Sequence, residues 1–429
     1  MIGLIVTSII DVSIVKINDL IDKYFIPMQS KLILFTINSS VCLLLQFYLV
    51  RHIYVTFQRH KPNRTLKVKA IYTVSLLSLG ILTVLIGSLI FQQFYNDYYN
   101  AILTISIIAL SYASAAGFVI WLSLLFFSWY RTSHDVIVLF YFISMSVIAI
   151  NLIVTASYTC AKLNDRPQLA SEFVGSSGDL SGGKHKLLNN AYIVTSFMSF
   201  VSIWATTAIL MNYYREKLIN SIVYWIILSI PLVYFIITYF YQYILGNLLN
   251  SFLEIDPVSV SIVLGAFLAL SKPIGGILFG IVFWNISRIL GYEINIKMYM
   301  IISGWGILLI FSSNQAATQI VSPYPPFGLA TITVLVSASY LMLLGIYNSA
   351  TLVSVNNELR TSIHRHALKL LNPIGRAEME REIQKTVSKI SEDKEIANIS
   401  GDEPFEFDKE ELKKYLEEVI KVKRERAST

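Results

Sequence analysis

Cysteine and charge are both scarce in this 429-residue chain. It has two cysteines, Cys42 in an apolar stretch and Cys160 in a loop on the opposite side, so neither a disulfide framework nor a cysteine metal site is expected. Charged residues make up 14% and hydrophobic residues 55%, a balance too apolar for a soluble globular protein. The net charge of +6 belongs to the first 351 residues, because the acids and bases of residues 352–429 nearly cancel. We therefore expect no nucleic-acid partner, no metal and no cofactor.

Long apolar runs without a single Asp or Glu fill about half of the chain. A helix that crosses the roughly 30 Å hydrocarbon core of a bilayer needs about 20 mostly apolar residues. The sequence therefore predicts an all-α, polytopic transmembrane helix bundle of about nine spans, with the lipid bilayer as its surroundings. The windows that meet this requirement are 32–50, 70–92, 101–130, 136–158, 191–213, 221–247, 258–286, 298–313 and 328–350.

Basic residues between the runs fall almost entirely on alternate sides. The loop 51–69 carries six Lys and Arg, and Arg131, Arg288 and Lys297 follow on the same side. By the positive-inside rule this side is cytoplasmic, which predicts an outer N-terminus, an inner C-terminus and a location in the cell membrane. Asn63 begins a glycosylation acceptor pattern on the predicted inner side, so a glycan on Asn63 would invert this topology.

The alternation also divides the chain into three parts. Residues 1–31 are apolar but interrupted by Asp11, and we interpret them as an interfacial segment on the outer surface. Residues 32–351 form the transmembrane domain. Residues 352–429 form a cytoplasmic tail of amphipathic helices.

The seventh span contains the only basic residue inside any predicted span, Lys272. It is followed by Pro273, Gly275 and Gly276, which permit a kink or a short unwound stretch. In one interpretation this broken helix lines a cavity, and Lys272 binds an anionic or carbonyl-bearing ligand or gates a pathway. In the other, the amine bonds to freed carbonyls, and Gly276 with Gly280 forms a face for close helix packing. The sequence leaves both open.

Span eight ends in the other polar group of interest. Asn314 and Gln315 lie at its predicted outer end. Amide side chains bond across helices in membranes, so they either join helices or line an outer vestibule.

Two stretches resemble enzyme motifs but lack essential residues. Residues 178–184 match most of a phosphate-binding loop, yet His185 stands where Ser or Thr would bind Mg²⁺. Residues 356–363 look like the phosphoacceptor helix of sensor histidine kinases, but Asn357 replaces the essential His and no ATP-binding pattern follows. The protein is therefore not expected to be an enzyme.

The tail carries two short apolar stripes at helical spacing. Residues 372–375 break the exit helix of span nine, residues 376–390 and a helix starting near 408 are each predicted to be helical, and 391–407 is the predicted linker. Helices this short are marginal alone, so they should dock on each other, on the protein's own loops or on a cytoplasmic partner. The stripe residues are Met379, Ile383 and Val387 in the first helix, and Leu412, Leu416 and Val419 in the second.

Residues 258–429 also carry a resemblance to a known family. The segments Ser271–Gly280, Ser313–Ala316, Pro323–Gly328 and Asn372–Ile383 resemble an uncharacterised multi-pass membrane protein family of ammonia-oxidising archaea. The resemblance implies an archaeal cell membrane. It assigns no activity and no functional residues.

The leading hypothesis is a non-enzymatic protein that senses or binds something outside and relays it through its tail to a cytoplasmic partner. A small-solute transporter or channel that uses the broken seventh span is the main alternative. A structural subunit of a membrane complex is the third. The sequence does not specify the ligand or the oligomeric state.

Overall fold

The computed structural model describes residues 3–11, 28–60, 66–96, 100–164, 186–212, 221–240, 257–289, 294–317, 325–356, 359–361, 363 and 370–400. Within these ranges the chain is helical and contains no strand. Residues 3–11 form a short N-terminal helix. The longer helices are α2 (Met28–His60), α3 (Leu66–Asn96), α4 (Ala101–Ser133), α5 (Val136–Asn164), α6 (Lys186–Asn212), α8 (Ser221–Tyr239), α10 (Pro257–Ile289), α11 (Ile294–Ala317), α12 (Leu329–Val355) and α14 (Leu371–Ser400).

The predicted membrane-spanning architecture is confirmed. Eight of the described helices, α2 to α6 and α10 to α12, are long and apolar enough to cross a membrane. The remaining window, 221–247, coincides with α8, whose described apolar part, Tyr224–Thr238, is shorter than a full span. The chain is therefore an integral, multi-pass membrane protein.

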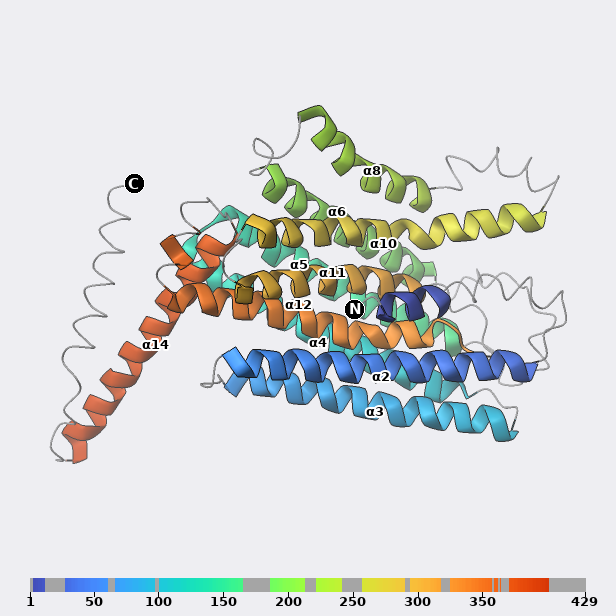
Figure 1. Cartoon of the computed structure of the whole chain (residues 1–429), viewed down its shortest axis with the longest axis horizontal. Coiled ribbons are helices and arrows are strands. Elements are labelled where there is room, and N and C mark those ends of the chain that lie inside the picture. Colours follow the sequence, from blue (N-terminus) through green and yellow to red (C-terminus); the bar gives the residue numbers. More distant parts are fainter. Residues whose placement is uncertain are drawn as a thin grey trace.

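Helix α12 lies at the centre of the bundle (Figure 1). Its whole apolar window is buried inside the protein, whereas a third of that of α3 is buried. A helix that is apolar all round and buried all round does not need a polar face, which explains why its sequence shows no amphipathic stripe. Because α2, α3, α4, α11 and α14 all pack against it, α12 contacts more of the molecule than any single neighbour does.

Glycines bring α10, α11 and α12 into close contact. A Cβ on Gly280 would lie 2.9 Å from the Gly304 carbonyl oxygen, and one on Gly306 would lie 2.7 Å from the Met342 nitrogen. Real Cβ atoms do not approach backbone so closely, so these positions require glycine for the helices to meet at this separation. The α10–α11–α12 layer is thus fixed by backbone proximity.

Helix α14 begins at the bundle and then leaves it. Its first turns, including Leu371, Ile374 and Ala377, are buried, while its far end projects away from the other helices (Figure 1). The predicted linker 391–407 is wrong over its first ten residues, because α14 continues as one helix to Ser400. The predicted break at 372–375 is instead the first turn of this helix, where a proline is tolerated because its missing N–H would have no helical partner.

The N-terminal helix, residues 3–11, packs onto the bundle. Leu4, Thr7, Ser8 and Asp11 are buried. We expected this segment to lie at the membrane surface. In the structure its last residue, Asp11, contacts the start of α12.

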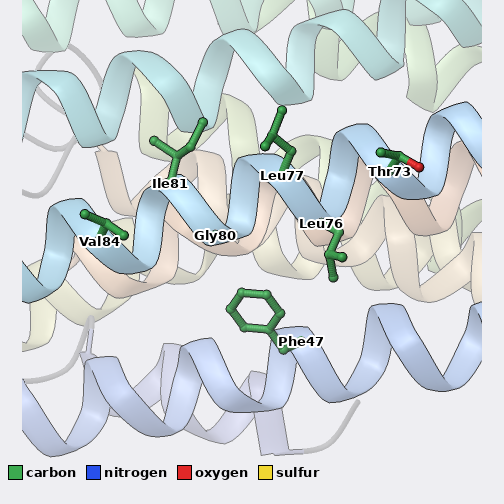
Figure 2. A pocket seen from close by; sticks show the side chains of 7 residues that line it. All are labelled: Phe47, Thr73, Leu76, Leu77, Gly80, Ile81 and Val84. Carbon is green, nitrogen blue, oxygen red and sulfur yellow. The ribbon is translucent and has the colours of Figure 1, made fainter.

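An open apolar groove runs between α2 and α3. Its volume is about 710 Å³, and Phe47 on α2 points across it toward α3 (Figure 2). Its other lining residues are Thr73, Leu76, Leu77, Gly80, Ile81 and Val84, and none is charged. Such a surface suits contact with lipid acyl chains.

The ends of the helices that carry the basic loops lie together. The last residues of α2, α4 and α10 and the first residues of α3, α5 and α11 all lie at the end of the bundle from which α14 leaves (Figure 1). We call this the α14 end and the other the far end. The inside–outside assignment of these two ends stays a prediction.

Candidate ligand-binding site

Lys272 is buried in α10 and faces an aromatic pair. Its Nζ donates to the Tyr192 hydroxyl at 3.2 Å and lies 5.3 Å from the centre of that ring. The Tyr192 ring stacks on Tyr158, with ring centres 5.2 Å apart. Among the described residues Lys272 makes no ion pair. A buried ammonium with three N–H donors and one neutral acceptor is costly, because burial removes the water that would bond to the other two.

Neighbouring helices place this amine toward the far end of the bundle. Helix α10 is about 50 Å long, so its midpoint is a poor guide to depth. Tyr192 lies only about 9 Å from the first residue of α6, and Tyr158 about 9 Å from the last residue of α5. Lys272 lies about 24 Å from Arg288, in the last turn of α10. The lysine is therefore nearer to the far end than its central position in α10 suggests.

The sequence motif around Lys272 forms continuous helix. Helix α10 runs from Pro257 to Ile289 through Pro273, so it has no unwound stretch at Gly275 and Gly276. A Cβ on Gly275 would collide with the Phe200 ring, and one on Gly276 would lie 3.1 Å from the Leu308 carbonyl oxygen. These glycines, like Gly280, face closely packed neighbours and not a cavity.

Asn314 joins three other helices through a chain of side-chain hydrogen bonds. The Tyr112 hydroxyl of α4 donates to Asn314 Oδ1 at 3.0 Å, and Asn314 Nδ2 donates to Asn151 Oδ1 of α5 at 2.9 Å. Asn151 Nδ2 in turn donates to Thr195 Oγ1 of α6 at 3.3 Å. Each of the two amides thus accepts one hydrogen bond and donates another. All the bonds run in the same direction, so they polarise one another.

Helix α6 connects the lysine to this network. Tyr192, the partner of Lys272, and Thr195, the last member of the chain, lie about one turn apart. Thr195 Oγ1 also lies 3.3 Å from the Tyr192 carbonyl oxygen. We define the polar cluster as Tyr112, Asn151, Tyr158, Tyr192, Thr195, Lys272 and Asn314, contributed by α4, α5, α6, α10 and α11.

Two buried hydroxyls next in the chain to residues of the polar cluster have no partner. Ser313 Oγ, next to Asn314, and Ser196 Oγ, next to Thr195, are buried with no hydrogen-bond partner in the described part of the chain. Buried polar groups normally have partners. Each of these two hydroxyls therefore gains a hydrogen bond if water or a small polar ligand reaches it. Gln315, the other predicted vestibule residue, is half-buried and also engaged in an interaction.

The sequence singled out Lys272 and Asn314 but missed their partners. Tyr112, Asn151, Tyr192 and Thr195 each lie in an apolar run, and nothing in one helix shows which neighbour a polar side chain will meet. A usable signal was that Asn151 is an amide inside a predicted span and Asn314 an amide at the end of another, where polar side chains form hydrogen bonds to other helices.

A second polar contact lies at the α14 end. The Trp129 Nε1–H of α4 donates to Glu378 Oε2 of α14 at 2.7 Å, and Arg381 lies 3.5 Å from the same oxygen. Glu378 is 1% exposed. A buried carboxylate bonded to an indole N–H and an adjacent arginine fixes the position of α14 on α4.

The first apolar stripe of the tail, on α14, is buried at one end only. Met379 is buried, Ile383 is half-buried and Val387 is 52% exposed. The second stripe, Leu412, Leu416 and Val419, lies outside the described residues, as do residues 178–184. No group of three or more His, Cys, Asp or Glu side chains gathers within the described ranges.

Comparison of the chain with protein-family models, with curated proteins and with solved structures found no match.

Proposed function

We propose that this is a non-enzymatic membrane receptor that binds a small polar ligand at the polar cluster and relays the change to a cytoplasmic partner through α14. One observation carries the proposal. Helix α4 contributes Tyr112 to the polar cluster and Trp129 to the α14 contact, about 26 Å apart on one continuous helix. A ligand that shifts α4 at one end therefore acts on α14 at the other.

The chemistry of the polar cluster favours an anionic or carbonyl-bearing ligand. The Lys272 ammonium has N–H donors beyond the one that Tyr192 accepts. A ligand oxygen at this position would gain a charge-assisted hydrogen bond and would remove the cost of an unpaired buried cation. The unsatisfied hydroxyls of Ser196, which follows Thr195, and Ser313, which precedes Asn314, offer further hydrogen bonds.

The far part of α14 fits a role in output. It projects from the bundle and carries the exposed Val387 beyond the buried first turns. A long helix fixed at one end converts a small rotation at Glu378 into a larger displacement at its tip. The same geometry also suits a subunit that holds a larger membrane complex together, the third alternative from the sequence.

The transporter alternative has less support in the arrangement of the helices. It depended on an unwound seventh span, and α10 is continuous through Lys272 and Pro273. A flux measurement nevertheless separates it from the receptor proposal, because a transporter moves solute and a receptor does not.

The experiment attaches a fluorophore to a Val387→Cys variant, with Cys160 replaced by serine, in lipid nanodiscs. Formate, glutamate and inorganic phosphate are the first anions to be tested. We expect at least one to change the fluorescence in a saturable way. Lys272→Met should weaken that response at least tenfold, as expected for loss of a charged contact of about 1.4 kcal/mol or more.

Two further variants control this experiment. Lys297→Met removes an exposed cation at the α14 end and should leave the response unchanged. Glu378→Leu should abolish the fluorescence change while the anion still raises the unfolding temperature, because binding is kept and transmission is lost. A response that survives Lys272→Met, or anion-driven flux into vesicles, would contradict the proposal.

A further inference from the structure

Helix α12 begins deep among other helices without a cap of its own. Its N-cap residue, Gly328, has φ 92° and no side chain to bond to the first turn. The Ala330 carbonyl oxygen lies 3.6 Å from Cys42 Sγ, about 21 Å along α2 from its first residue. In Figure 1, α2 and α10 both extend beyond this end of α12. The first N–H groups of a helix lack partners and carry partial positive charge, so a buried start needs an acceptor.

Asp11 of the N-terminal helix supplies that acceptor. Its Oδ2 accepts from the Thr331 backbone N–H at 2.9 Å and from Thr331 Oγ1 at 2.8 Å. Thr331 is the third residue of α12, the position that an N-cap side chain normally bonds to. Asp11 is fully buried. A carboxyl group from a distant part of the chain thus does what a local Ser or Asp would do elsewhere.

The site offers more polar groups than Asp11 uses. Asp11 Oδ1 has no hydrogen-bond partner in the described residues, and neither have Ser8 Oγ, Asn38 Nδ2 and Ser39 Oγ, all of them buried. Burial raises the pKa of Asp11, while hydrogen bonds from Gly328 and Thr331 at the start of α12 oppose that rise. No charged side chain contributes to this shift. The carboxyl group is therefore held by donors alone.

We propose that the start of α12 is a carboxylate-binding site, and that Asp11 occupies it as a tethered ligand. The backbone N–H of a helix start, the Thr331 hydroxyl and the Asn38 amide are the groups that recognise a carboxylate. A small free carboxylate competes with Asp11 for them and releases residues 3–11 from the bundle. This site and the polar cluster share no residue, so either can exist without the other.

The test removes the tethered group and offers it back in solution. In Asp11→Ala the full chain in nanodiscs should unfold about 2–4 °C below the wild type, as expected for a lost helix cap. Sodium formate or acetate should recover at least half of this loss, formate more than acetate because the space left is that of one carboxyl group. Sodium chloride at the same ionic strength should recover none of it. All proteins are compared in a Lys272→Met background, so that formate bound at the polar cluster does not contribute. In this background the chain with Asp11 intact should show no stabilisation, because its site is filled.

Two variants separate a binding site from a merely structural cap. In the double variant Asp11→Ala with Thr331→Val, formate should recover nothing, because the hydroxyl donor is gone. If Asp11→Ala cannot be purified, Asp11→Asn takes its place, and hydrogen exchange in residues 3–11 should rise with formate and not with chloride. Equal recovery by chloride, no recovery by either salt, or unchanged exchange in the asparagine variant would each overturn the proposal.

Discussion

Single polar side chains in this bundle matter through the partner that each one meets. Lys272 and Asn314 stand out in the sequence because ionisable and amide groups are expensive in an apolar span. The sequence does not pair Lys272 with Tyr192 or Asn314 with Asn151, because a hydrogen bond between helices depends on the rotation and depth of both. Asp11 shows the same limit more sharply. It lies outside every predicted span, yet its side chain is buried at the start of α12.

The Asn314 amide should contribute more to the free energy of unfolding than the neighbouring hydroxyls do. In Asn314→Leu the Tyr112 hydroxyl and Asn151 Oδ1 lose their partners inside the bundle. We expect a loss of about 1–2 kcal/mol in the free energy of unfolding, since orphaned buried polar groups cost about 1–3 kcal/mol. Thermal or denaturant unfolding in detergent measures it. Ser106→Ala is the control, because that exposed hydroxyl bonds only to the carbonyl of its own helix.

A double-mutant cycle makes the network test stricter. Asn151→Leu should destabilise alone, but adding it to Asn314→Leu should cost less than the sum of the two, because both remove the same bond. Additive losses would show that Asn314 and Asn151 act independently, and the chain of hydrogen bonds would then have no energetic meaning.

At the scale of helices, the apolar runs predicted the elements well and their ends poorly. Each of the nine windows overlaps a described helix, because about 20 apolar residues in a row have few alternatives to a helix in a membrane. The Pro273 and Gly275 motif predicted a break that α10 does not have. Packing against Phe200 and α11 holds the glycines in the helix. Helix α14 extends through the first ten residues of the predicted linker because no strong breaker occurs before Gly401.

Two glycines in helices should respond to alanine in opposite directions. A Cβ on Gly375 of α14 would collide with Val353 of α12, whereas one on Gly80 of α3 would meet nothing within 4 Å. Gly375→Ala should therefore destabilise the protein by about 1–3 kcal/mol through overpacking. Gly80→Ala should stabilise it by up to about 1 kcal/mol through helix propensity. Unfolding temperatures of the two variants, measured together, test both signs.

The two glycine variants should also differ in which part of the protein becomes easier to unfold. Limited proteolysis in Gly375→Ala should cut between α12 and α14 faster than in the wild type, because α14 no longer seats on Val353. Gly80→Ala should keep the wild-type digestion pattern. If Gly375→Ala leaves both stability and digestion unchanged, α14 is not fixed to the bundle at this residue.

For the whole molecule, two groups of residues far apart in the sequence explain the arrangement. The central position of α12 follows from a sequence that is apolar on every face, and glycines set its separation from α11. Its two ends receive the two parts of the chain that the span pattern left undefined, the N-terminal helix through Asp11 and α14 through Gly375. Apolar periodicity cannot predict this, because both contacts depend on single polar or small residues.

The orientation of the whole bundle rests on its basic loops and can be tested with single cysteines. Cys42 is buried, so only Cys160 needs replacement by serine to give a silent background. In intact cells a membrane-impermeant maleimide should label Tyr95→Cys, an exposed residue at the far end, and should spare His134→Cys, an exposed residue of the α4–α5 connection. After permeabilisation both should react to a similar extent. This outcome is expected because Arg131 and its basic counterparts keep their end in the cytoplasm.

The reverse pattern would invert the bundle, expose α14 to the outside and leave the polar cluster facing the cytoplasm. In that case the receptor proposal would lose its direction, while the carboxylate site at the start of α12 would be unaffected.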